Sequence, residues 1–311
     1  MLTRQIIDRI VGAALDEDAP WGDITSELFI PAGATASARL VAREPGVFSG
    51  GEVLVRTMRA VDERIRVSVL LADGDRFAKG QALAVIAGPA RGILRGERVA
   101  LNLVQRMSGI ATLTSRYVEL AAGTDARIVD TRKTTPGLRA LERHAVVCGG
   151  GRNHRNSLSD AVMAKDNHLA VLTAGGRSVT DAIRAVRAQL GHTTHLEVEV
   201  DRMDQIEPVL AGGVDTIMLD NFTVDELRDG VALVNGRAIV EASGNVNLDT
   251  VAAIAATGVD VISVGALTHS VRSLDIGLDV DIDFDADADF EAEAVGIGYS
   301  GTARLPYDDE E

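Results

Sequence analysis

The sequence predicts an α/β protein that combines an N-terminal α+β open sandwich with an incomplete (β/α) barrel of six to seven parallel strands. Three observations support this fold class. The first third of the chain contains short segments of alternating apolar and polar residues, which are typical of antiparallel strands. From residue 127 onward, strand-like and helix-like segments alternate, as in a parallel sheet. The strands expected there end in polar residues, where enzymes built on such barrels carry their functional groups.

The N-terminal region begins with apolar residues at helical spacing over residues 3–16, and an acidic loop follows. Between residues 35 and 90 we expect three or four antiparallel strands, crossed by a helix over residues 51–62. Residues 91–122 carry a helical pattern that is interrupted near Ser108 and Gly109. This helix is the expected hinge between two domains.

The second region should supply the barrel. Its candidate strands start near residues 127, 161, 195, 215, 237 and 260, and candidate helices cover residues 178–190, 203–211, 223–234 and 247–257. A doubly wound sheet would gather its ligands at one switch point, whereas here every strand end is polar. After Arg272, strict alternation over residues 273–284 predicts one amphipathic strand that returns to the N-terminal region. The expected domains are residues 1–110, 111–272 and 273–284, with an acidic tail over 285–311.

Composition limits the classes of function. No apolar run reaches the roughly 18 to 20 residues of a membrane span, and the N-terminus does not resemble a signal peptide, so we expect a cytoplasmic protein. The single cysteine, Cys148, forbids an internal disulfide. The net charge of −15 and the lack of a basic stripe argue against a nucleic-acid partner. Residues 281–311, with eleven acidic residues and one arginine, suggest a halophilic, high-salt cytoplasm; a GC-rich genome would explain the arginine bias alone.

Lysine is scarce, because the chain has three lysines and 28 arginines. Arginine replaces lysine well on a surface, but it cannot replace a compact ammonium that meets a phosphate as a point charge. Two of the three, Lys133 and Lys165, lie in the cation-rich stretch from Asp130 to His168. We therefore interpret these two as chemical residues and Lys79 as incidental.

Several cations of this stretch directly follow expected strand ends, namely Arg132, Lys133 and Lys165. A glycine-rich loop adds His154 and Arg155, and its glycines allow close approach to a ligand. Arg139 and Arg143 are spaced i, i+4 on a helix, a pattern more typical of an exposed surface. Together, the strand-end and loop cations predict a pocket for a substrate with several negative charges.

Carboxylates are expected on the same side of the sheet. Glu197 and Glu199 alternate with apolar residues, so both should point into the barrel, and Asp220 ends the next strand. Such carboxylates suit Mg²⁺ or the stabilisation of a developing cation; a buried Arg–Glu network is the structural alternative. The turns at 243–245 and 264–270 contain glycine and could bind phosphate. No histidine spacing supports zinc, and Cys148 lacks the orienting group that a nucleophile needs.

The motifs NLVQRMSGIAT, DTRKTTPGLR, GGGRNHRNSLSD, AKDNH, EVEVD, MLDN, EASGNVN and VGALTHSVRSLDIGLD occur in this order. Through them the chain resembles the quinolinate phosphoribosyltransferases over about residues 20–280. The resemblance implies a homodimer, or a higher oligomer, whose active sites are shared between subunits, with Mg²⁺ as cofactor. The implied reaction joins quinolinate to phosphoribosyl pyrophosphate and releases nicotinate mononucleotide, pyrophosphate and CO₂, a step in the de novo synthesis of NAD.

The resemblance also assigns roles to residues. Arg132, His154, Arg155 and Lys165 would hold the two carboxylates of quinolinate, and Arg106 would come from the partner subunit. Lys133 and Lys165 would contact phosphoribosyl pyrophosphate, with Glu199 and Asp220 serving its Mg²⁺ and facing the ribose. The 5′-phosphate would be cradled by Ser243, Gly244, Asn245, Gly265 and His269. The implied catalytic residues are Lys133, Lys165, Glu199 and Asp220.

Two alternatives remain at this point. A related transferase could accept another aromatic acid, which would show in the acid that yields pyrophosphate and CO₂. A phosphate-binding barrel could instead use Lys165 as a Schiff-base nucleophile, as aldolases do, which borohydride trapping would reveal.

Overall fold

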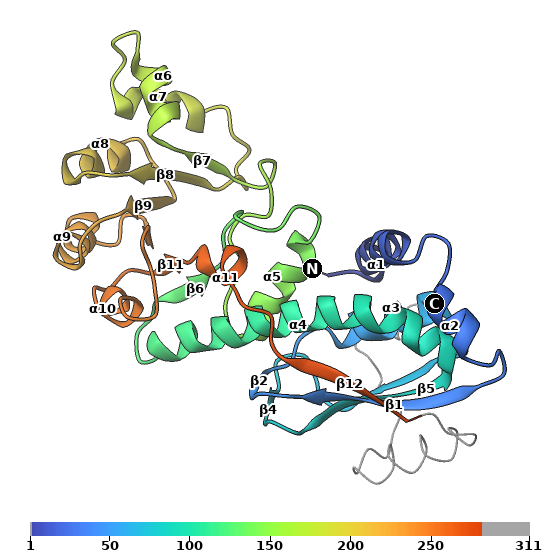
Figure 1. Ribbon diagram of the computed structural model, residues 1–311. Coiled ribbons are helices and arrows are strands. Elements are labelled where there is room, and N and C mark those ends of the chain that lie inside the picture. Colours follow the sequence, from blue (N-terminus) through green and yellow to red (C-terminus); the bar gives the residue numbers. More distant parts are fainter. Residues whose placement is uncertain (1, 282–311) are drawn as a thin grey trace. The chain divides into compact units, whose positions relative to one another are not determined.

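The computed structural model describes residues 2–281, and the side chain of Asp281 is not described. The chain forms two compact units (Figure 1). Of the described residues, the first unit contains 2–111 together with 272–281, and the second contains 112–271. The sequence boundary between them falls inside one long helix, α4 (Ala90–Leu120).

The first unit contains two antiparallel sheets. The larger one has the order β12-β1-β5-β3, and the smaller one pairs β2 with β4. Its elements are α1 (Arg4–Asp18), α2 (Ile24–Phe29), β1 (Thr35–Ala42), β2 (Gly46–Val47), α3 (Gly51–Val61), β3 (Arg66–Val69), β4 (Arg76–Phe77), β5 (Ala82–Pro89) and β12 (Ile276–Asp281). The predicted N-terminal helix, the crossing helix and the antiparallel strands are confirmed. Helix α2 was not predicted, and the acidic loop expected over residues 16–25 overlaps only its first two residues.

The core of this unit lies between the four-stranded sheet and the helices α3 and α4. Leu40 on β1 and Ile86 on β5 pack there with Leu54 and Met58 on α3 and with Ile93 on α4. All five side chains are fully buried. The apolar residues that alternate along the strands therefore pack against the apolar face of α3 in one layer, as an open sandwich requires.

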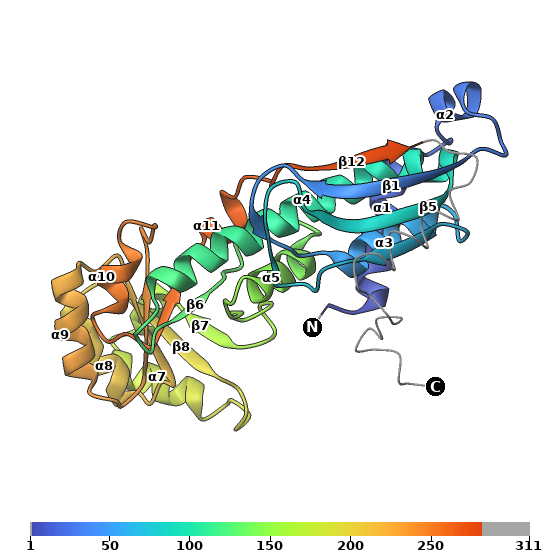
Figure 2. The same cartoon turned by 90° about the horizontal axis from the view of Figure 1, so that it is seen from below.

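The C-terminal strand returns to the first unit, as predicted. Strand β12 pairs with β1 in antiparallel register, with Leu278 opposite Leu40, and Figure 2 shows the two strands side by side. Leu274 and Ile276 are buried in the core, where Leu278 and Val280 also pack. The rest of the predicted strand and the acidic tail lie outside the described residues.

The prediction that the long helix is interrupted near Ser108 and Gly109 is wrong. Helix α4 runs through both residues. Ser108 is buried, where its hydroxyl accepts from the Ser49 N–H and donates to the Ser49 carbonyl, both at 3.2 Å. Gly109 faces the backbone of Arg272, whose carbonyl oxygen occupies the space that a side chain would need. These two residues allow close packing and do not break the helix.

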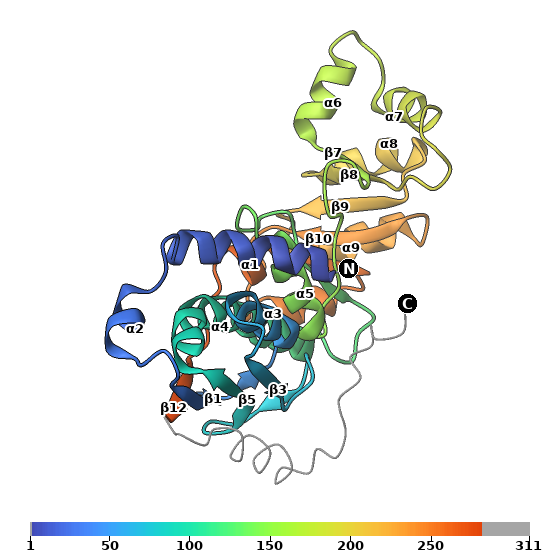
Figure 3. The same ribbon diagram turned by 90° about the vertical axis from the view of Figure 1, so that its right-hand side faces the viewer.

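The second unit contains a six-stranded parallel sheet with the order β6-β11-β10-β9-β8-β7. Its strands are β6 (Arg127–Val129), β7 (Val162–Ala164), β8 (Leu196–Val200), β9 (Thr216–Asp220), β10 (Ile239–Ser243) and β11 (Val261–Ser263). All six predicted strands are present within two residues of their expected starts. Because β6 and β7 form the two edges, the sheet is open, as the prediction of an incomplete barrel requires; Figure 3 shows the run from β7 to β10.

Helices α7 (Val179–Arg187), α8 (Ile206–Ala211), α9 (Val224–Val234) and α10 (Val251–Ala255) follow the strands, as predicted. Val198, Ile217 and Val240 point to the helical side of the sheet and are buried. Two further helices are α5 (Arg139–Cys148) and α11 (Ala266–His269). Helix α6 (Asp166–Thr173) was not predicted, and none of its residues is buried, so it lacks the apolar face by which the others were found. Among the described residues, no helix is both long and apolar enough to cross a membrane.

Gly109 should be intolerant of a side chain. We expect Gly109→Ala to lower the free energy of unfolding by about 1–3 kcal/mol, because the added methyl group would displace the Arg272 backbone. Gly12, in the interior of α1, is a matched control: a methyl group there meets no atom within 4 Å. Gly12→Ala should therefore stabilise the protein by about 0.5–1 kcal/mol. Urea unfolding of both variants measures the difference, and equal effects would contradict the packing role.

Candidate active site

The candidate site is organised around Asp130, which follows β6 directly and is fully buried. Its Oδ1 accepts hydrogen bonds from the Arg143 guanidinium at 3.1 Å and from the His154 N–H at 2.8 Å. The Asn153 amide, in the orientation that satisfies both of its ends, donates to Asp130 Oδ2 at 2.6 Å. The interpretation of Arg143 as an exposed surface residue is wrong, because its side chain is largely buried in this pair.

Burial raises the pKa of Asp130 to about 6, and the charge of Arg143 works against this rise. Arg143 also donates to the His154 carbonyl at 2.7 Å. Arg139 donates to the Asn156 carbonyl at 3.1 Å and to the Thr134 hydroxyl at 2.9 Å, so it too holds the loop. The glycine-rich loop that carries His154 and Arg155 is thus attached to the end of β6 by two arginines of α5.

His154 contacts two buried carboxylates of the sheet. Its Nε2 lies 3.1 Å from Glu197 Oε2 and 3.5 Å from Glu241 Oε2. Burial alone would lower the pKa of His154, but the hydrogen bonds to the two glutamates outweigh it and raise the pKa to about 10.

The His154 Nδ1, however, accepts from the Arg155 N–H at 2.7 Å, which a doubly protonated ring could not do. We therefore place the single ring proton on Nε2, where it faces the carboxylates of Glu197 and Glu241. The three ligand atoms also lie within 4.8 Å of one another, so this His154 cluster could hold a metal ion.

Arg155 and Arg132 place two positive charges close together. Burial lowers the pKa of Arg155, and the charge of Arg132 lowers it further. Arg155 donates to the Ala161 carbonyl at 3.0 Å. Among the described residues, the buried Nε of Arg132 has no hydrogen-bond partner. Two guanidiniums in this arrangement, one with an unsatisfied donor, suit an anionic ligand with more than one carboxylate.

The parallel register brings Lys165 next to Glu199. Met163 on β7 lies opposite Glu197 on β8, so the residue two positions further along each strand faces the same side. The Lys165 ammonium contacts Glu199 Oε2 at 2.6 Å. The two glutamates of β8 therefore share a face, as predicted, but they have different partners: Glu197 binds His154 and Glu199 binds Lys165.

The turn after β10 is joined to the end of β9 through Asn221. The Asn221 N–H donates to the Ser243 carbonyl at 2.9 Å, and its side-chain amide donates to Asp220 Oδ2 at 2.8 Å. Asn245 donates to Asn221 Oδ1 at 3.0 Å. Gly244 has a φ of 88°, and a side chain there would collide with Asn221. The predicted residues Asp220, Ser243, Gly244 and Asn245 thus form one cluster.

The turn after β11 brings Gly265, Lys133 and His269 together. A side chain at Gly265 would come within 3.1 Å of the Lys133 side chain and 3.0 Å of His269 Nε2. The Thr268 hydroxyl donates to the Lys133 carbonyl at 2.8 Å. Arg106, the remaining predicted residue, lies on α4 in the first unit, whereas the other predicted residues belong to the second.

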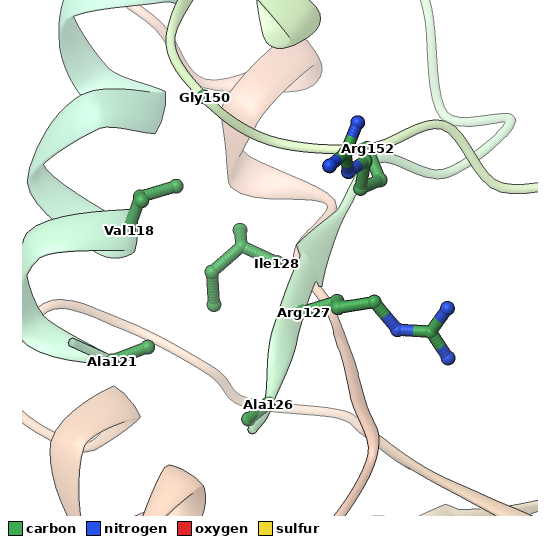
Figure 4. A pocket seen from close by; sticks show the side chains of 7 residues that line it. All are labelled: Val118, Ala121, Ala126, Arg127, Ile128, Gly150 and Arg152. Carbon is green, nitrogen blue, oxygen red and sulfur yellow. The ribbon is translucent and has the colours of Figure 1, made fainter. Parts of the chain in front are cut away.

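A pocket of about 180 Å³ lies away from these groups, near the start of β6 (Figure 4). Val118 and Ala121 of α4, Ile128 of β6 and the two arginines Arg127 and Arg152 line it. The candidate residues gather around the opposite, C-terminal ends of the strands, where (β/α) barrels carry their chemistry. We therefore do not place the active site in this pocket.

The sequence analysis counted Glu241 and Asn221 only among the polar residues at strand ends, and it placed Arg143 on an exposed surface. The structure places all three among the candidate groups. Glu241 interrupts an apolar strand, and this was the one local signal that could have singled it out. Asn221 and Arg143 have ordinary sequence contexts. Their positions depend on residues far away in the chain.

The comparisons with known proteins all indicate the same family. Residues 23–108 match the N-terminal domain and residues 110–279 the C-terminal domain of quinolinate phosphoribosyl transferase. The chain is 46% identical over 273 residues to the nicotinate-nucleotide pyrophosphorylase [carboxylating] of Mycobacterium leprae, covering 86% of this chain and 94% of that protein. A probable nicotinate-nucleotide pyrophosphorylase [carboxylating] of Bacillus subtilis is 42% identical over 264 residues, covering 85% and 90%. The crystal structure of NadC from Streptococcus pyogenes superposes with a TM-score of 0.86 at 39% identity, covering 91% and 99%.

Removal of the Asp130 carboxylate should unfold the loop around His154. We expect Asp130→Ala to lower the free energy of unfolding by about 3–5 kcal/mol, because Arg143 would keep a buried charge without its partner. The matched control is Glu207→Ala, which breaks the exposed pair of Glu207 with Arg237 and should cost less than about 1 kcal/mol. Chemical denaturation measures both. A loss at Asp130 as small as at Glu207 would contradict the central role of this pair.

Proposed function

The chain belongs to the quinolinate phosphoribosyltransferase family, and on this premise we propose that it transfers a phosphoribosyl group from phosphoribosyl pyrophosphate to quinolinate. The products are nicotinate mononucleotide, pyrophosphate and CO₂, so the reaction serves the de novo synthesis of NAD. Phosphoribosyl transfer to another aromatic acid and a Schiff-base reaction at Lys165 are not favoured by this membership. A Schiff-base lysine also needs a free amine, whereas Lys165 is held in an ion pair with Glu199.

The neighbouring charges of two guanidiniums carry the proposal. Arg132 and Arg155 are partly buried and near enough for one charge to act on the other. A single carboxylate would leave one of these charges without a counterion, whereas the two adjacent carboxylates of quinolinate can satisfy both. Lys165 adds a third cation, and His154 supports the loop that carries Arg155.

The second substrate fits the neighbouring turns. We assign the 5′-phosphate to the turns that contain Ser243, Gly244, Asn245 and Gly265, together with His269. Backbone N–H groups of such turns are donors for phosphate oxygens. Lys133, whose side chain lies against Gly265, can reach the pyrophosphate as a point charge. We assign Glu199 and Asp220 to the ribose.

These residues can also serve Mg²⁺. Glu199 and Asp220 lie on neighbouring strands, and the register places both on the inner face of the sheet. Mg²⁺ in such sites takes one or two carboxylates and completes its shell with water and substrate phosphates, so this pair fits. When bound, Mg²⁺ would neutralise charge on the leaving pyrophosphate.

The reaction requires the ribose to develop positive charge as pyrophosphate leaves. Glu199 and Asp220 can stabilise this oxocarbenium-like centre, while Lys133 and Lys165 stabilise the leaving group. Arg132 and Arg155 hold the pyridine ring so that its nitrogen can attack C1′. The 2-carboxylate then leaves as CO₂, and the electron pair stays on the ring carbon beside the new pyridinium until a proton is taken up.

A direct assay tests the function. With phosphoribosyl pyrophosphate and Mg²⁺, quinolinate should yield equal amounts of pyrophosphate and CO₂, whereas nicotinate and nicotinamide should yield neither. In the same assay, Lys165→Arg should lower kcat/KM by at least about 10²-fold, about 2.7 kcal/mol, because a planar guanidinium cannot reproduce the ammonium. Lys79→Arg is the matched control and should be silent. Turnover of nicotinate in place of quinolinate would overturn the proposed substrate, and equal activity of the two variants would remove Lys165 from the site.

We also propose a homodimer in which Arg106 of one subunit completes the site of the other. An exposed apolar surface in the first unit supports a partner: Trp21, Ile24, Leu28 and Phe29 on and beside α2 are each more than two-thirds exposed. Apolar clusters of this kind mark protein interfaces. A cytoplasmic location and a halophilic origin remain predictions of the sequence.

Mixing two inactive variants tests the shared site. If Arg106 reaches across the interface, Arg106→Ala and Lys165→Ala subunits should together form heterodimers with one intact site each. Activity should then recover to about a quarter of the wild-type level after random exchange. Each variant subjected alone to the same exchange protocol is the control. Proven subunit exchange without recovered activity would place Arg106 in its own subunit's site or outside it.

A further inference from the structure

Both ring nitrogens of His154 are occupied by groups of the protein itself. Nε2 faces the carboxylates of Glu197 and Glu241, and Nδ1 accepts from the Arg155 N–H at 2.7 Å. The ring therefore links the inner face of the sheet to the backbone of Arg155.

The two glutamates are unusual for a buried sheet. They are 4% and 3% exposed and come from β8 and β10, the strands on either side of β9. Each has one carboxylate oxygen toward His154, while the other, Oε1, is buried without a hydrogen-bond partner among the described residues. A buried carboxylate oxygen without a hydrogen-bond partner lowers the stability of the folded protein. A cluster that only had to fill the barrel would be more stable with apolar side chains.

The charge of Glu197 also reaches Arg155. The positive charge of Arg132 lowers the pKa of Arg155, and the negative charge of Glu197 acts in the opposite direction. Glu197 therefore offsets part of the repulsion between the two guanidiniums while no ligand is bound. An apolar residue in its place would provide neither this charge nor a hydrogen bond to His154.

We propose that Glu197 and Glu241 are positioning residues of the dicarboxylate site, which hold Arg155 near Arg132 through His154. This inference rests on the proposed function, because it assumes that Arg132 and Arg155 bind the two carboxylates of the substrate. It assigns no contact between substrate and either glutamate. Their effect on the acid should be separable from any effect on phosphoribosyl pyrophosphate.

Isosteric variants test the inference. Glu197→Gln and Glu241→Gln keep the side-chain volume and remove the charge, and Glu207→Gln, at an exposed position of α8, is the surface control. We expect each buried variant to raise the KM for quinolinate about tenfold or more and to leave the KM for phosphoribosyl pyrophosphate within about twofold. Equal increases in both KM values would indicate a general structural role, and an unchanged KM for quinolinate would refute positioning.

A double-mutant cycle shows whether the glutamates act through His154. If they do, Glu241→Gln in a His154→Ala background should change the KM for quinolinate by less than about twofold, because the link is already broken. Independent, multiplying effects would overturn the proposal. A metal analysis could also overturn it. If the purified wild-type enzyme contains one equivalent of metal and the Glu241→Gln variant contains none, the His154 cluster is a metal site. The wild-type assay distinguishes failure of the proposed function from failure of this inference. If the wild-type enzyme does not turn over quinolinate, the proposed function is rejected. If it does and the variants behave like the wild type, only this inference is rejected.

Discussion

The candidate site depends on one buried ion pair, between Asp130 at the end of β6 and Arg143 on α5. A long loop without regular structure would otherwise have to be held by apolar contacts, which are not directional. The fixed fork of the guanidinium and the two carboxylate oxygens instead define where the backbone around His154 lies. The desolvation of both charges opposes this pair, and additional hydrogen bonds compensate for it. Here those bonds come from the His154 N–H and the Asn153 amide.

The register of the parallel sheet provides the second constraint. Residues opposite one another on neighbouring strands point to the same face, so a charged residue at every second position forms a continuous inner layer. Glu241 lies opposite Met218 and Met218 opposite Glu199, while Ser243 lies opposite Asp220. The outer face of the same strands carries buried valine and isoleucine that pack against helices. The alternation of side chains along each strand thus places apolar residues in the core on one face and the functional groups on the other.

This alternation explains what the sequence could predict. Strands, most helices and the shared face of Glu197 and Glu199 depend on periods of two or 3.6 residues, which are visible locally. The partner of each glutamate depends on residues more than 30 positions away, so it was not visible. The i, i+4 spacing of Arg139 and Arg143 is the same on an exposed and on a buried helical face. Gly109 shows the same limit: a helix break and a close backbone contact have the same sequence signature, and only the position of Arg272 distinguishes them.

Local charge in this site opposes the charge of the whole chain. The protein carries −15 overall, yet cations dominate around the ligand positions proposed for Arg132, Arg155 and Lys165. A distant negative field is screened within about 10 Å at 0.1 M salt, whereas partly buried groups a few ångströms apart interact almost unscreened. Nearby carboxylates must therefore balance these cations when the site is empty. Glu199 does so for Lys165 through a direct ion pair, and the charge of Glu197 partly does so for Arg155.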